Sequence, residues 1–72
     1  MVKGWIVEVT YLRGGRILTD RYAVAIAERE AAVSTLKQHI QIPATVIARE
    51  VMSEATYYRL GLTPGKTLRL GK

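Results

Sequence analysis

A glycine pair flanked by two alternating segments places the strongest constraint on the fold. From Trp5 to Leu12, apolar side chains at odd positions alternate with positions that include Glu8 and Thr10. A period of two is typical of a strand with one buried face. Gly14-Gly15 follows, and two glycines readily take the positive φ values that a two-residue hairpin turn requires. The first third of the chain is therefore predicted to be a β-hairpin.

The predicted turn also sets the register of the hairpin, because it pairs Arg13 with Arg16. On one face the resulting cross-strand pairs are Thr10 with Thr19 and Glu8 with Arg21. Both pairs are favourable in antiparallel sheets. On the other face the pairs are Tyr11 with Leu18, Val7 with Tyr22 and Trp5 with Val24. The one mismatch is Asp20, a charged residue opposite Val9.

Residues 28–40 change to a helical period. Their apolar face carries Val33, Leu36 and Ile40. Glu28 and Glu30 lie where the positive end of the helix dipole stabilises negative charge. The Ile42-Pro43 step follows, and the residue before a proline avoids helical geometry. We therefore expect one main helix that ends near Ile40.

The last third of the chain combines short elements. Residues 45–52 are rich in β-branched side chains and are predicted to be a strand. Ser53 is placed to cap a short helix over 54–60, with Gly61 as its left-handed stop. A strand is the competing interpretation, since Thr56, Tyr57 and Tyr58 favour β structure. Thr63-Pro64-Gly65-Lys66 matches a type II turn, followed by a final strand over 67–70.

The predicted fold is an α+β domain with a single four-stranded mixed or antiparallel sheet and the main helix on one face. Its order of elements, β-β-α-β-short α-β, is similar to that of β-grasp, ubiquitin-like domains. The conjugating members of that family end in a Gly-Gly pair, whereas this chain ends Gly71-Lys72, so modifier activity is not implied. We expect the sheet to contribute these residues to the core facing the helix: Trp5, Val7, Val9, Tyr22, Val24 and Ile47.

With 72 residues and no cysteine, residues 1–72 are interpreted as one small domain without disulfides or thiolate metal sites. Such a domain buries only roughly 60% of its unfolded surface, and small domains often gain burial by oligomerising. We expect a homodimer, formed through an edge strand or through an outward apolar patch of Ile6, Leu12 and Ile17. The longest apolar run, Ala23–Ala27, is far too short to span a bilayer, so a cytoplasmic chain without membrane association is predicted.

Catalytic and metal-binding signatures are missing from the sequence. The single histidine, His39, has no carboxylate cluster near it, and Ser34 lies in no nucleophile motif. Gly65-Lys66-Thr67 resembles the end of a phosphate-binding loop, but the preceding glycine would have to be at position 60, which is Leu60. The sequence therefore predicts no enzyme activity, no cofactor and no metal.

Charge distribution is the remaining functional signal. Residues 55–72 hold four of the eleven basic residues and none of the six acidic ones. Basic and aromatic side chains together suit phosphates and stacked bases. The candidate nucleic-acid-binding residues are Tyr57, Tyr58, Arg59, Lys66, Arg69 and Lys72. Basic residues on an edge strand also discourage aggregation. We therefore expect a non-enzymatic protein-interaction or dimerisation module, with nucleic-acid binding as the alternative.

Overall fold

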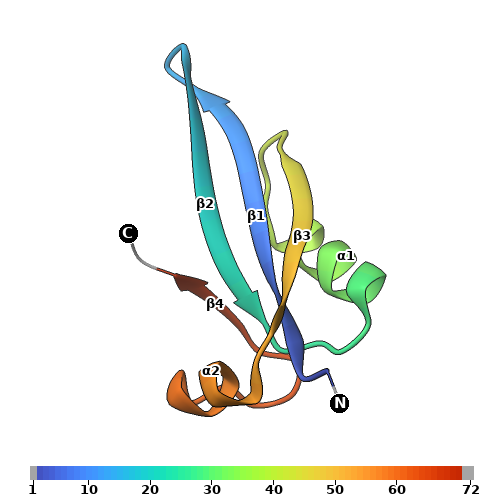
Figure 1. Cartoon of the computed structure of the whole chain (residues 1–72). Helices are drawn as coiled ribbons and strands as arrows, with labels where there is room; N and C mark the ends of the chain where they lie inside the picture. Colours follow the sequence, from blue (N-terminus) through green and yellow to red (C-terminus); the bar gives the residue numbers. More distant parts are fainter. Residues whose placement is uncertain (1, 71–72) are drawn as a thin grey trace.

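The computed structural model describes residues 2–70. Within this range the elements are β1 (Gly4–Arg13), β2 (Arg16–Val24), α1 (Arg29–His39), β3 (Thr45–Met52), α2 (Glu54–Arg59) and β4 (Thr67–Leu70). All strand pairs are antiparallel, and the sheet order is β3-β1-β2-β4 (Figure 1). This confirms the predicted α+β class and the single four-stranded sheet. The likeness to β-grasp domains is one of element order along the chain.

The hairpin has the predicted register. Every predicted pair from Trp5–Val24 to Arg13–Arg16 is present, without a shift. Gly14 and Gly15 have φ values of 59° and 77°, as the tight turn requires. The alternating pattern and the turn chemistry act on neighbouring residues only, which explains why the sequence was sufficient here.

The sheet face covered by α1 forms the larger of two apolar clusters. Leu36 of α1 is fully buried against this face, together with Val7 and Val24. Trp5 closes one end, where its indole N–H donates to the carbonyl oxygen of Ala27 at 2.9 Å. The predicted packing of the helix through Leu36 is therefore confirmed, with Val33 and Ile40 partly buried at the border.

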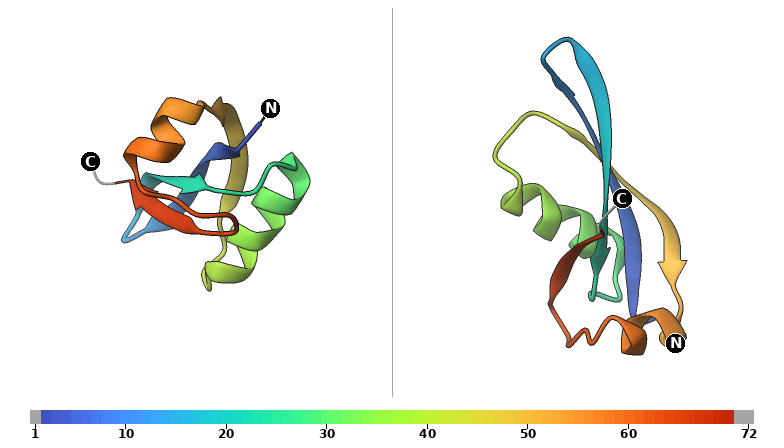
Figure 2. Two further views of the ribbon diagram at one scale, coloured as in Figure 1. Left: turned by 90° about the horizontal axis from the view of Figure 1, so that it is seen from below. Right: turned by 90° about the vertical axis from the view of Figure 1, so that its left-hand side faces the viewer.

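A second apolar cluster lies on the opposite face, beneath α2. Figure 2 shows α1 and α2 on opposite sides of the sheet. The buried members are Ile6, Ala23, Ala25, Met52, Tyr57 and Leu62. The prediction that Ile6 is an outward surface residue is therefore wrong, because α2 and the segment after it cover this end of the sheet. Leu12 and Ile17 are exposed, as predicted.

A bulge in β3 decides which of its side chains are buried. Ile6 pairs with Glu50 while Val7 pairs with Ala48, so Arg49 is an extra residue. Ala48 lies in the cluster under α1, whereas its neighbour Ile47 is 41% exposed. The prediction of Ile47 as a core residue is therefore wrong, because adjacent residues of a strand point to opposite faces.

The segment after β3 is helical, which confirms the preferred interpretation of residues 54–59. The Thr56 N–H donates to Oγ of Ser53 at 3.1 Å, so Ser53 caps α2 as predicted. Gly61 has a φ of 67°, and the Leu62 N–H donates to the carbonyl oxygen of Tyr57 at 3.2 Å. Neither helix within residues 2–70 has the length and apolar character needed to cross a membrane.

Candidate interaction surface

The outer half of the β1–β2 hairpin extends beyond its neighbouring strands (Figure 1). β3 pairs with β1 from Gly4 to Thr10, and β4 pairs with β2 from Arg21 to Val24. Among residues 2–70, no strand lies on the side of β2 away from β1 between Arg16 and Asp20. Backbone groups at such an edge are available to pair with another chain.

Two large aliphatic side chains are exposed on this outer half. Leu12 and Ile17 lie directly opposite each other and are 70% and 75% exposed. They lie on the face opposite α1, farther along the hairpin than the cluster under α2. We call Leu12 and Ile17 the tip pair. Single exposed apolar residues are common in proteins, whereas these two form one apolar pair at the end of the hairpin.

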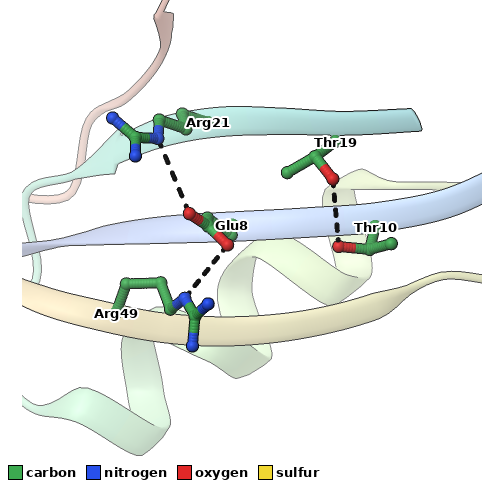
Figure 3. A network of polar contacts seen from close by, with 5 residues as sticks. All are labelled: Glu8, Thr10, Thr19, Arg21 and Arg49. Atoms are coloured by element: carbon green, nitrogen blue, oxygen red, sulfur yellow. Dashed lines mark hydrogen bonds and ion pairs between the residues drawn. The ribbon is translucent and has the colours of Figure 1, made fainter. Parts of the chain in front are cut away.

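A polar belt separates the tip pair from the buried cluster on the same face. Figure 3 shows Glu8 between two arginines of the neighbouring strands. Arg49 Nε lies 3.0 Å and Arg21 Nε 3.6 Å from the Glu8 carboxylate oxygens. Thr10 and Thr19 complete the belt, with their hydroxyl oxygens 3.4 Å apart. Since both arginines are mainly exposed, their ion pairs with Glu8 contribute little to the stability of the fold.

The helix side of the hairpin carries a groove of about 610 Å³. Its lining residues are Val9, Tyr11, Leu12, Arg13, Asp20, Tyr22, Ile40, Ile42 and Pro43. The groove lies between the hairpin and the segment that follows α1, and most of its lining is apolar. Because Leu12 of the tip pair is one of the lining residues, the apolar surface extends from the tip pair into the groove.

Two polar contacts account for the charged Asp20 opposite Val9. The Tyr11 hydroxyl donates to Asp20 Oδ2 at 3.0 Å, and Arg69 Nη2 donates to Oδ1 at 3.3 Å. The hydrogen bond to Asp20 raises the pKa of the Tyr11 phenol above its ordinary value, and desolvation adds to this rise. The carboxylate thus links β1, β2 and β4 beside the groove.

The structure does not gather the residues predicted to bind nucleic acid on one surface. Tyr57 is buried in the cluster under α2, so little of its ring is exposed for a base to stack on. Tyr58 is 65% exposed and meets Tyr57 edge to face. Lys66 is exposed in the turn before β4, and Lys72 lies outside the described residues.

The two remaining arginines of that prediction lie on opposite faces. Arg69 contacts Asp20 on the helix side of the sheet. Arg59 lines a shallow hollow of about 400 Å³ on the other face, together with Arg21 and Leu70. A single nucleic-acid strand following one face would therefore meet only part of the predicted set.

Within the described part of the chain, no three His, Asp or Glu side chains lie close enough together to hold a metal ion. His39 is exposed at the end of α1. Comparison with protein-family models, with curated proteins and with solved structures found no match for this chain. Sequence reasoning located the tip pair but missed the groove, for which the position of a charged residue, Asp20, opposite Val9 was the available signal.

Proposed function

We propose that the chain is a small cytoplasmic, non-enzymatic module that associates with a protein partner through the outer half of the β1–β2 hairpin. The observation that carries this proposal is the exposed tip pair on a hairpin whose β2 edge, among residues 2–70, is uncovered from Arg16 to Asp20. Fully burying an aliphatic side chain of this size is favourable by about 1.5–3 kcal/mol. Association thus removes apolar surface that the fold itself leaves in water.

The test replaces the tip pair by the double variant Leu12→Ser/Ile17→Ser. We expect the variant to lose association with any partner while it keeps its melting temperature, since both side chains are largely exposed. Two readouts are needed: self-association by sedimentation, and retention of proteins from a cell extract on the immobilised chain. Val51→Ser is the matched control, because Val51 is 49% exposed on β3, away from the tip. Unchanged binding in both readouts would reject the proposal.

Nucleic-acid binding is the second candidate, and one observation favours it. Tyr58 and Arg59 are adjacent and exposed at the end of α2, and Lys3 Nζ lies 5.9 Å from the centre of the Tyr58 ring. An exposed aromatic ring beside basic groups suits a base and its phosphate. The overall charge of +5 adds a general attraction to polyanions.

A titration with single-stranded and double-stranded nucleic acid at low salt tests this second candidate. Each phosphate contact would add about −0.7 to −0.9 to the slope of log affinity against log salt. Tyr58→Ala should weaken binding by about 1–3 kcal/mol if the ring stacks on a base. Absence of binding at low salt would eliminate the candidate.

A further inference from the structure

The open edges of this sheet in the described range include β3, the four-residue β4 and the part of β2 that β4 leaves uncovered. The β3 edge is interrupted by the bulge at Arg49, and charged residues and bulges both disfavour pairing of edges. The β2 edge is regular, because its register with β1 shows no shift. It is also without a neighbouring strand from Arg16 to Asp20 in the described range. The free part of β2 is therefore the better docking edge.

Backbone hydrogen bonds identify which residues of β2 point outward. Ala25, just after β2, donates its N–H to the carbonyl oxygen of Lys66 at 2.8 Å and accepts from the Gly65 N–H at 2.8 Å. Residues two apart along a strand direct their backbone groups to the same side. In the free part of β2, Ile17 and Thr19 therefore direct their N–H and C=O groups away from β1.

The end of β4 limits how much of β2 an added strand can cover. Leu70 is paired with Arg21, so a strand on the same edge needs a gap before that position. With Asp20 left as the gap, the available segment ends at Thr19. If the added strand is an antiparallel copy of the same segment, an overlap centred at Ile17 pairs Arg16 with Leu18 of the second copy and lies within β2. That centre is a residue whose backbone groups point outward, as a hydrogen-bonded pair requires.

The exposure of its side chain also favours Ile17 as the centre of the pairing. Ile17 has the highest exposure, 75%, among the exposed large hydrophobic residues of the described chain. With the two-fold axis at Ile17, the tip pairs of two copies form one apolar row across four strands. The order in this row is Leu12, Ile17, then Ile17 and Leu12 of the second copy. Thr19 would lie opposite Gly15 of the second copy, a turn residue with a φ of 77°, so the paired strand segment covers residues 16–18.

We propose that two copies of this chain pair antiparallel through the free edge of β2, with the two-fold axis at Ile17, to form one continuous sheet. This inference rests on the proposed function and names its partner, a second copy. It requires no conformational change in β2, because the strand is extended from Arg16 onward and the tip pair is already exposed. The row of four aliphatic side chains supplies the apolar contact, and the backbone groups of Ile17 in each copy supply the hydrogen bonds.

Single cysteines test the register, because the chain contains no cysteine of its own. With the axis at Ile17, the two Cα atoms of residue 17 are about 5.5 Å apart, within the range for a disulfide. The two Cα atoms of residue 18 are about 8 Å apart, given a rise of ~3.3 Å per residue and a strand spacing of ~4.8 Å. That distance exceeds the disulfide limit of ~7 Å. Ile17→Cys should therefore cross-link and Leu18→Cys should not.

Leu12→Cys is the matched control, since Leu12 is 70% exposed and pairs with Ile17. The two copies of residue 12 lie three strand spacings apart, ~14 Å, in the proposed dimer. Pairing holds the two Ile17→Cys thiols at a high effective concentration, so their oxidation should be at least about tenfold faster than that of the control. Faster cross-linking of Leu18→Cys than of Ile17→Cys would overturn the register.

Sedimentation of the unmodified chain provides the independent measurement. We expect a species of two chains that Ile17→Arg converts to one chain, with an unchanged melting temperature. A single-chain mass at every concentration, together with slow cross-linking of Ile17→Cys, would overturn the inference. If the chain then still retained extract proteins in a way that depends on the tip pair, the proposed function would stand with a different partner. Loss of that retention as well would reject both.

Discussion

At the scale of single residues, Leu36 is the clearest contributor to stability. It has no exposed surface and packs α1 onto the sheet. Leu36→Ala should lower the free energy of unfolding by about 2–5 kcal/mol, through lost burial and the cavity that remains. Chemical denaturation measures this, with Ile47→Ala as control because Ile47 is 41% exposed. Equal effects of the two substitutions would show that α1 does not pack through Leu36.

Tyr11 gives the fold a pH dependence at the alkaline end. The hydrogen bond to Asp20 raises the pKa of the Tyr11 phenol in the folded chain. The contribution of Tyr11 to the free energy of unfolding is therefore complete below the unfolded pKa of about 10 and is lost as pH rises through the folded pKa. Tyr11→Phe removes the ionisable hydroxyl. The stability difference between the unmodified chain and Tyr11→Phe should therefore shrink above about pH 10. Denaturation at a series of alkaline pH values measures it, and a constant difference would contradict the link to Asp20.

At the scale of elements, Gly4 at the start of β1 lies in close contact with the ends of β2 and β3. A methyl group added at Gly4 would overlap the carbonyl oxygen of Val24 and the terminal carbon of Met52. Gly4→Ala should therefore displace backbone as well as side chain, and we expect a loss of about 1–3 kcal/mol.

Thermal melts of Gly4→Ala and Gly61→Ala separate this contact from backbone strain. Gly61 has a positive φ of 67° and open space around it, so its substitution tests strain alone. A smaller cost of Gly4→Ala in a Met52→Ala background than in the unmodified chain would show that Met52 obstructs the methyl group. An equal cost in both backgrounds would assign the overlap to the Val24 backbone.

At the scale of the whole molecule, net charge gives the two candidate functions opposite salt dependence. Two copies that each carry +5 repel one another, so added salt should strengthen self-association by screening. Binding to nucleic acid should instead weaken as salt displaces the protein from phosphates. Sedimentation and nucleic-acid titration across one salt series measure both. Self-association that weakens steeply with salt would contradict a contact made mainly by the apolar tip pair.

The sequence by itself determined the local features of this protein. The hairpin register, the capped α2 and the turn before β4 depend on contacts between residues close in the chain, so alternation, Ser53 and the glycines were sufficient. The exposed tip pair followed from the same alternation.

The tertiary structure alone decided which surfaces are covered. Strand order, the bulge at Arg49 and the position of α2 depend on packing between distant segments, and they reversed the predicted environments of Ile6 and Ile47. They also buried Tyr57 and gave Asp20 its partner Arg69, 49 residues away. The physical reason is that a short-range pattern specifies which face a side chain takes, whereas only the packing of distant elements specifies what lies against that face.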